Sequence, residues 1–325
     1  MPASPSRRAL LMALAACALS GPALADEWPA KPIRVVVGFA PGSTPDILAR
    51  LVSERLAQRL GKPVLVENKP GAAGNIGVDA VAKAVPDGYT FGVTISGPLA
   101  ANSLLFRHLP YKPESDLAMV SIAATQPSVL VVTPQSGIHD MPGLLAQLKA
   151  QPGKFNYASM GTGSISHLAL AALAARSGTE IVHVPYAGSG QAVMALLAGD
   201  AQLAVLPAVA VIQQVKAGKL RALAVATARR SSVLPNLPTL AESGLQDVQG
   251  DAWMGFIAPA GTAPAILNRM QAEIAAIVKS LDVIEKLHAQ LMEPVGSSAA
   301  QMRATVQADL ARWRPVIRRN GITLD

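Results

Sequence analysis

The sequence predicts an α/β protein of two domains, each a mainly parallel sheet flanked by helices. Short apolar runs alternate with segments whose apolar residues recur every three or four positions, which is the pattern of strands followed by helices. This alternation occurs twice along the chain. The length of 325 residues, of which 50% are hydrophobic, is enough for two packed cores.

The first unit of this pattern begins with a buried strand at residues 33–39. A helix follows, with Thr44 as its expected N-cap, Pro45 in its first turn and Gly61 at its end. A strand is then expected at residues 64–67, followed by a short helix that ends near residue 84 and by a further strand at residues 89–95. Because strands joined through helices pair in parallel, the sequence predicts a βαβαβ unit here.

A second such unit is expected to begin with a strand at residues 128–132. Its further elements are helices at 144–150 and 164–176 and strands at 155–159, 181–184, 203–206 and 223–226. The chain is completed by a strand at residues 254–259 and three helical segments at residues 264–279, 282–290 and 299–320. These last helices have no sheet of their own, so they are expected to return and cover the first sheet.

Domain 1 is therefore expected to be discontinuous, with domain 2 inserted into it. The predicted boundaries place residues 26–127 and 251–325 in domain 1 and residues 128–250 in domain 2. Two crossover segments, near 126–128 and 250–252, are then expected to act as hinges.

The first 25 residues have the three parts of a secretory signal peptide. An arginine pair at positions 7–8 precedes eleven apolar residues, and an Ala-Leu-Ala cleavage site ends at Ala25. We expect residues 1–25 to be removed and the mature protein to reach the periplasm. The arginine pair leaves twin-arginine export open beside the general secretory route, and lipoprotein anchoring at Cys17 is the minor alternative. No later apolar run reaches the roughly 18 to 20 residues of a membrane span.

Charge and cysteine usage exclude several classes of protein. The chain has 28 Lys and Arg against 21 Asp and Glu, and loss of residues 1–25 removes two arginines and no acid, which leaves a balance of +5. The basic residues are scattered without a reading motif, so no nucleic-acid partner is expected. The single cysteine, Cys17, is lost on cleavage after Ala25, which excludes disulfides and thiol catalysis.

No metal and no cofactor are expected. The five histidines show no short-range metal spacing, and an HExxH motif is absent. The glycines at 71, 74 and 77 have the spacing GxxGxxG, which is not that of a dinucleotide loop, and there is no GxxxxGK[ST] phosphate loop.

Two loops have a composition suited to ligand binding, residues 39–46 and 159–166. Both follow strands, are rich in glycine and hydroxyl groups and contain no lysine or arginine. Backbone N–H groups at a helix start attract anions, so two such loops facing one cleft predict a carboxylate site. The alternative is that both are ordinary tight turns with Ser or Thr caps. Asp46, an acid in the first turn of a helix, fits a structural role in its loop better than contact with a carboxylate.

Ser164 and His167 raise a catalytic alternative, a periplasmic hydrolase or lyase. They stand three residues apart at a helix start, but residues 161–165 read G-T-G-S-I and the GxSxG elbow is absent. A capping serine beside a partly buried histidine explains the pair better.

Eight motifs occur in order along the chain: WPAKPIRVVV from Trp28, FAPG from Phe39, Asp46 with Ala49-Arg50, VENKPGAAG from Val66, PDGYT from Pro86, HVPYAGS from His183, GKLRALA from Gly218 and LPTLAESG from Leu237. In this set and order the chain resembles the Bug family of periplasmic binding proteins, the solute receptors of tripartite tricarboxylate transporters. The similarity runs from Trp28 to Asp325.

The resemblance implies a venus-flytrap fold with a ligand cleft between two domains and no enzymatic activity. It implies that a small carboxylate is captured and delivered to the membrane subunits of a tripartite tricarboxylate transporter, by a protein expected to be a monomer. A ligand sensor that signals to a membrane partner stays open. The residues expected to bind ligand are Phe39, Pro41, Gly42, Ser43, Asp46, Ser96, Ser159, Gly161, Thr162, Gly163, Ser164, His167, Tyr186 and Asp251.

Two positions depart from the family pattern. Ser43 stands where a second glycine is usual, and Ala187 stands where a lysine is usual. Ser43 adds a hydroxyl at the start of a helix, and Ala187 removes a cation, so the identity of the ligand does not carry over.

Overall fold

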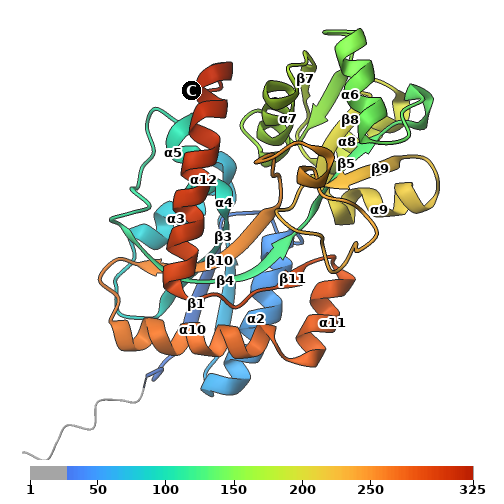
Figure 1. The fold of residues 1–325 in the computed structure, drawn as a ribbon. Helices are drawn as coiled ribbons and strands as arrows, with labels where there is room; N and C mark the ends of the chain where they lie inside the picture. The colour runs from blue at the N-terminus through green and yellow to red at the C-terminus, as the bar shows by residue number, and fades with distance from the viewer. Residues whose placement is uncertain (1–27, 325) are drawn as a thin grey trace, which may run out of the picture.

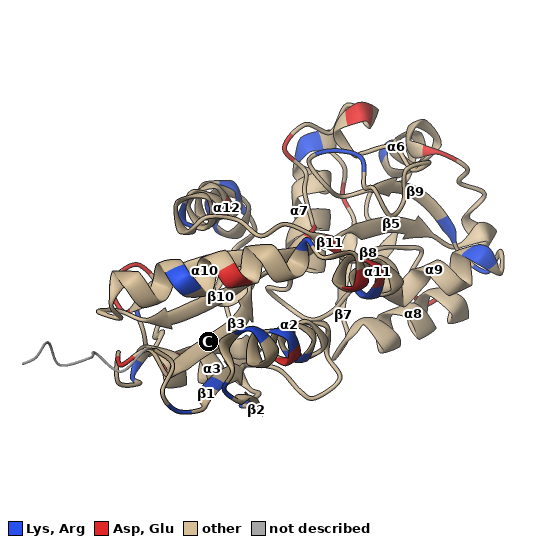
Figure 2. Ribbon diagram, turned by 90° about the horizontal axis from the view of Figure 1, so that it is seen from below, with Lys and Arg blue, Asp and Glu red and all other residues tan. Residues whose placement is uncertain are grey.

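The computed structural model describes residues 28–324, which form two sheets flanked by helices (Figure 1). The expected signal peptide at residues 1–25 lies outside these described residues. Within residues 28–324, none of the helices combines the length and the apolar character needed to cross a membrane. Basic and acidic residues are interspersed along both halves of the ribbon (Figure 2).

The first sheet has six strands in the order β11-β4-β10-β3-β1-β2. Their bounds are β1 (Ile33–Val37), β2 (Val64–Asn68), β3 (Thr90–Ile95), β4 (Leu117–Gln126), β10 (Ala252–Pro259) and β11 (Glu293–Pro294). β1 pairs in parallel with β2 and β3, so the predicted βαβαβ unit is confirmed. β10 lies antiparallel between β3 and β4, and β11 pairs antiparallel with β4. The sequence pattern does not predict β4, which is rich in Ala, Ser and Thr, or the two-residue β11.

Helices cover both faces of the first sheet. One face carries α2 (Thr44–Leu60), α10 (Pro264–Val278) and α11 (Leu281–Ala289), and the other carries α3 (Asn75–Ala82), α4 (Ser96–Leu99) and the first half of α12 (Ala299–Asn320). Alternation along β1 produces this arrangement, because Val35 packs on the α2 side and Val36 on the α3 side. The short helix α5 (Asn102–Leu105) follows α4. We call this sheet and its helices, without α12, the first lobe.

The ends of α2 differ in one detail from the prediction. Its N-cap is Ser43 and not Thr44, because Ser43 has extended backbone angles (φ −70°, ψ 158°) and Thr44 is already helical. Pro45 stands in the first turn as expected, and Gly61 ends the helix in the left-handed conformation at φ 66°.

The second sheet has five strands in the order β7-β6-β8-β5-β9. Their bounds are β5 (Ser128–Val132), β6 (Asn156–Ser159), β7 (Val182–Pro185), β8 (Leu203–Pro207) and β9 (Arg221–Val225). β6 is parallel to β7 and β8, but β5 is antiparallel to β8 and β9. The prediction that a parallel unit begins at β5 is therefore wrong. β5 follows β4 across the single residue Pro127, and without a helical crossover nothing requires a parallel pairing. Both sheets are mixed and not mainly parallel.

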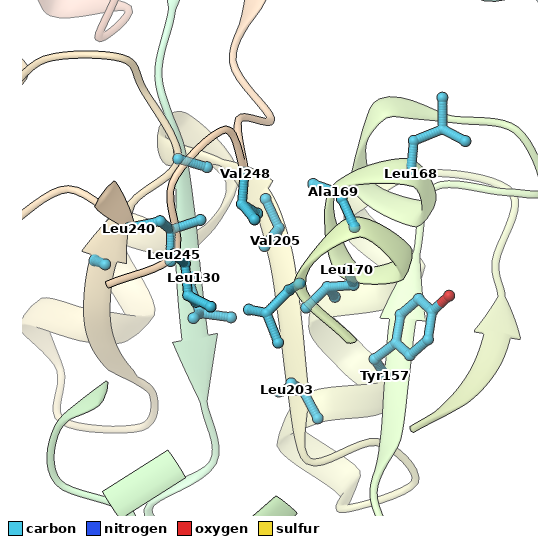
Figure 3. Close-up of a cluster of buried hydrophobic side chains, with 14 of the residues drawn as sticks. Leu130, Tyr157, Leu168, Ala169, Leu170, Leu203, Val205, Leu240, Leu245 and Val248 are labelled. Atoms are coloured by element: carbon cyan, nitrogen blue, oxygen red, sulfur yellow. The ribbon is translucent and has the colours of Figure 1, made fainter. Parts of the chain in front are cut away.

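The helices of the second sheet are α6 (Met141–Ala150), α7 (Ile165–Ser177), α8 (Ser189–Ala198) and α9 (Ala208–Lys216). α6 and α7 pack on one face and α8 and α9 on the other. Figure 3 shows part of the first of these cores, where Leu130 and Val205 of the sheet lie beside Leu170 of α7. α8 and α9 lie in stretches for which the pattern predicts no helix. Three 3₁₀ turns complete the described elements: η1 (Ala72–Gly74), η2 (Pro134–Ser136) and η3 (Ala241–Ser243). We call this sheet and these helices the second lobe.

Helix α12 joins the two lobes. Met302 and Val306, near its start, pack in a core of the first sheet, whereas Trp313 and Ile317 pack in a core of the second. Its 22 residues span about 33 Å, which is long enough for both contacts. The expectation that the trailing helices cover the first sheet therefore holds for α10, α11 and the first half of α12 only. Figure 1 shows the second half of α12 between α5 and α7.

The chain passes from the first sheet to the second at Pro127 and returns between β9 and β10. These two passages agree in position with the expected crossover segments. The division into moving domains at residues 127/128 and 250/251 stays a prediction.

Candidate ligand-binding site

Asp46 organises the loop between β1 and α2. The residue is 2% exposed, and its Oδ2 accepts hydrogen bonds from Gly42 N (2.9 Å) and Arg50 Nε (3.0 Å). Its Oδ1 accepts one from Asn68 Nδ2 (2.8 Å), which also donates to the Phe39 carbonyl (3.0 Å). Burial opposes ionisation, but the hydrogen bonds from Arg50, Gly42 and Asn68 hold the pKa of Asp46 below its usual value. The carboxylate holds the loop together, as expected for its structural role.

The tip of this loop uses its own backbone amides. Gly42 N donates to Asp46, and Ser43 N donates to the Ala40 carbonyl (3.1 Å). The expectation that free amides of this loop hold an anion is therefore wrong for Gly42 and Ser43. Pro41 and Gly42 are exposed, and the polar group that the tip retains is the hydroxyl of Ser43.

Three hydroxyls at this edge of the first sheet are buried without a hydrogen-bond partner in the described part of the chain. They belong to Ser43, the N-cap of α2, and to Thr94 and Ser96 at the end of β3. Because β1 and β3 are parallel neighbours, their carboxyl ends lie at the same edge. A buried hydroxyl without a partner costs roughly 1–3 kcal/mol, so each one requires an explanation. The 17-residue helix α2 also directs its positive end toward Ser43.

The second loop, between β6 and α7, is held mainly by its own side chains. Ser159, fully buried at the end of β6, accepts a hydrogen bond from Gly161 N (3.1 Å). Ser164 Oγ donates to the Gly161 carbonyl (2.6 Å), and Ser166 Oγ accepts from Met160 N (2.8 Å). Gly161 has a φ of 110°, which other residues rarely adopt. The loop is therefore a tightly bonded turn.

Ser164 and His167 do not form a nucleophile–base pair. Ser164 caps α7 by accepting the backbone N–H of His167 (3.4 Å), and the His167 ring instead accepts Gly163 N at Nδ1 (3.0 Å). A second serine–histidine contact joins Ser159 Oγ to His183 Nε2 at 2.6 Å. Ser159 is fully buried, and its hydroxyl is already engaged with His183 and with both backbone groups of Gly161. The geometry supports the capping interpretation of this loop.

The remaining candidates divide between the two lobes. Tyr186 follows β7, and its backbone N–H donates to the Ser159 carbonyl (3.1 Å). Thr162 is the exposed tip of the second loop. Asp251 precedes β10 at the edge of the first sheet that also carries Ser96, since β10 pairs antiparallel with β3. Burial, followed by the negative charges of Asp309 and Glu293, raises the pKa of Asp251 to about 6.

The structure thus gathers the candidates into two groups. Phe39 to Asp46, Ser96 and Asp251 lie at one edge of the first sheet, and Ser159 to His167 and Tyr186 lie at the carboxyl ends of β6 and β7. Helix α5 packs in the core of the second sheet through its N-cap Ala101 and through Leu105, and a Cβ atom on Gly163 would lie 2.9 Å from Leu105. That all of these side chains contact one ligand stays a prediction.

A cavity of about 410 Å³ adjoins the second loop. Its lining residues are Tyr157, Thr162, His167, Ala171, Ala174, Ile181, His183, Asn320, Gly321, Ile322 and Thr323. The end of α12 and the segment after it therefore close one side of this space. Among residues 28–324, no group of three or more His, Cys, Asp or Glu side chains is arranged to hold a metal ion.

Sequence reasoning missed Asn68 and His183. Both stand in strands next to the loop that they support: Asn68 ends β2 beside β1, and His183 lies in β7 beside β6. Polar residues at or near the carboxyl end of a neighbouring parallel strand are the signal that would have identified them.

Two mixed α/β lobes with Ser- and Gly-rich loops at the strand ends are an architecture of solute-binding receptors. Residues 48–322 match the family described as "Tripartite tricarboxylate transporter family receptor", and the chain belongs to this family. The family is one of solute receptors and not a class of enzymes.

Its relatives confirm the resemblance to the Bug family. The chain is 37% identical over 312 residues to Protein BugT of Bordetella pertussis, covering 96% of each. It is similar to the structure "R. palustris Rpa4515 with adipate" (34% identity, TM-score 0.80, 91% of this chain and 99% of that chain). It is also similar to MatC (Rpa3494) from Rhodopseudomonas palustris with bound malate (30% identity, TM-score 0.74, 89% and 100%).

Proposed function

We propose that this chain is a periplasmic receptor that captures a small organic acid in a cleft between its two lobes. It then delivers the acid to the membrane subunits of a tripartite tricarboxylate-type transporter. The observation that carries the proposal is the pair of buried, unpartnered hydroxyls of Ser43 and Ser96 at one edge of the first sheet. The relatives solved with adipate and with malate support a carboxylate, since both of those ligands are dicarboxylates.

In this proposal a ligand carboxylate accepts hydrogen bonds from Ser43 and Ser96 and lies at the positive end of α2. Arg50, the arginine nearest in sequence to the loop, is bonded to Asp46, so hydroxyls and the helix supply the attraction. Thr162 and Tyr186 approach from the second lobe. The site is complete only when both lobes contribute.

The periplasmic location and the transporter partner are supported by other observations. The charged, apolar and cleavage parts of residues 1–25 favour export, and membership of the family favours a transporter partner. A monomeric state stays a prediction.

Calorimetric titration with adipate, malate and citrate tests the site. Ser43→Ala and Ser96→Ala should each weaken the affinity about fivefold to thirtyfold, since each removes roughly 1–2 kcal/mol of hydrogen bonding to a charged group. Ser53→Ala is the matched control, because Ser53 lies in the same helix α2 and its buried hydroxyl likewise has no partner in the described chain. The proposal is wrong if none of the three acids binds, or if Ser53→Ala weakens binding as much as Ser43→Ala.

A further inference from the structure

Two histidine rings from different elements stack behind the second loop. His167, in the first turn of α7, and His183, in β7, have ring centroids 3.7 Å apart and planes inclined by only 8°. Tyr157 of β6 lies beside both rings, with its centroid 5.0 Å from that of His183 and 6.2 Å from that of His167. The three rings form a cluster next to the second loop.

Each histidine is bonded to one glycine of the loop. His167 Nδ1 accepts the backbone N–H of Gly163 directly (3.0 Å). His183 Nε2 lies 2.6 Å from Ser159 Oγ, and that oxygen accepts the N–H of Gly161 (3.1 Å). Both glycines have positive φ, 110° at Gly161 and 75° at Gly163, a region that glycine adopts readily. The two bonds fix the direction of their amides within this turn.

The partner of His167 determines which of its ring nitrogens carries the proton. Because Gly163 N is a donor, Nδ1 of His167 has no proton and the proton of the neutral ring is on Nε2. Ser159 Oγ accepts from Gly161 N and also lies 3.2 Å from the Gly161 carbonyl, so its hydrogen can go to that carbonyl or to His183 Nε2, and either tautomer of His183 fits the contact. Protonation of His167 at Nδ1 would set one donor against another and break the bond to Gly163.

The surroundings disfavour positive charge on the pair. Burial, and then the neighbouring His183, lower the pKa of His167 to about 4, and burial also lowers the pKa of His183. Among residues 28–324, the only other titratable group lining the adjoining cavity is Tyr157, whose pKa is raised by burial, so that it is neutral. The other residues of that lining, on α7 and β7 and at the end of α12, are uncharged. Nothing in this lining balances an imidazolium.

We propose that His167 and His183 are positioning residues, which hold residues 161–164 in the shape that meets the ligand, and that the hold of His167 on Gly163 lasts only while its ring is neutral. The inference rests on the proposed function, because it assigns the purpose of the loop. It adds a consequence that the family assignment does not contain: acid should release the loop, and with it the ligand.

Two substitutions at one position separate hydrogen bonding from packing. His167→Asn keeps an acceptor close to the place of Nδ1 but does not titrate, whereas His167→Phe keeps an aromatic ring in the stack but has no acceptor. Amide exchange at Gly163 in the ligand-free protein should be about tenfold faster than wild type in His167→Phe at pH 7, the ratio for one lost hydrogen bond. In His167→Asn it should stay within about threefold of wild type. Equal exchange in the two variants would overturn the inference.

The pH dependence gives the second measurement. Opening at Gly163, corrected for the intrinsic exchange rate, should increase in the wild type as the pH falls from 7 toward 4 and stay flat in His167→Asn. His183→Gln keeps an acceptor toward Ser159, so amide exchange at Gly161 should stay close to that of the wild type in this variant. An increase of the same size in wild type and His167→Asn would contradict the role of the ring.

Binding is then compared between the same proteins. If adipate binds, its affinity should fall more steeply in the wild type than in His167→Asn as the pH is lowered. Protonation of adipate itself affects both proteins equally, so the difference between them reports on His167. If neither adipate nor malate binds the wild type, the proposed function fails, and the exchange measurements still decide whether the histidines hold the loop.

Discussion

At the scale of single residues, the proposed site attracts its ligand through hydroxyls and not through basic side chains. The loop between β1 and α2 contains no arginine, and Arg50 behind it is bonded to Asp46. The hydroxyl of Ser43 has no partner among the described residues. In the proposed site, this serine would offer the ligand a hydrogen bond that a glycine cannot.

Asp46→Asn should destabilise the protein by about 1–3 kcal/mol at pH 7, because an amide cannot accept from both Gly42 N and Arg50 Nε while also facing Asn68. The pKa of Asp46 is lowered in the folded state, so its contribution is present above the unfolded value of 3.8 and is lost as the pH falls through the folded value. Urea unfolding at pH 7 and pH 3 measures both effects.

Asp282→Asn is the control for this change. Asp282 pairs with Arg55 on the surface, with 51% of its side chain exposed, and an exposed ion pair contributes little to stability. Equal losses in the two variants would show that the bonds of Asp46 do not hold the loop.

At the scale of elements, charged side chains cluster where the segment between β9 and β10 lies near α12 and β11. Asp251 precedes β10, Asp309 of α12 accepts from Trp253 Nε1 (2.8 Å) and pairs with Arg312 (2.6 Å), and Glu293 lies in β11. Burial raises the pKa of Asp309 as well. Several acids thus surround the segment where the chain returns to the first sheet.

Asp251→Asn should raise the melting temperature at pH 7. The folded pKa of about 6 exceeds the ordinary value of 3.8, so the charged form costs stability above pH 6, and this cost disappears as the pH falls from 6 toward 3.8. The advantage of the variant should therefore shrink toward pH 4. Asp247→Asn, at a position 77% exposed, is the comparison and should change the melting temperature little. A variant less stable than wild type at pH 7 would contradict this account.

The whole molecule is two lobes connected by two chain passages and by α12. We expect a ligand that contacts both lobes to favour a closed form, since only that form offers it all of its contacts. Small-angle scattering should give a smaller radius of gyration with ligand than without. Amide exchange should slow together in residues 40–46 and 159–166. Protection of only one of these loops would mean that the site does not lie between the lobes.

The contacts of α12 bear on how far such closure can extend. Trp313 and Ile317 pack in the core of the second sheet, while Met302 packs in that of the first. The backbone N–H of Leu324 also donates to the carbonyl of Leu105 in α5 (3.0 Å). The predicted hinge would therefore have to include α12 as well as the two segments expected from the sequence.

Sequence alone determined what depends on neighbouring residues. The period of apolar positions placed β1, α2, α7 and the three last helices within a few residues of their bounds. Gly61 ends α2 and Ser164 caps α7, because a left-handed residue and a short hydroxyl side chain satisfy a helix end locally. The family motifs are likewise readable from consecutive residues, and the family is confirmed.

Only the tertiary structure decided what depends on residues far apart in the chain. The antiparallel direction of β5, the contact of α12 with both lobes, and the bond between Ser159 and His183 each join segments that no local pattern relates. The same holds for hydroxyls without partners, because whether Ser43 and Ser96 are satisfied depends on every group that packs around them. Local periodicity encodes which residues are buried, whereas the path of the chain determines which of them meet.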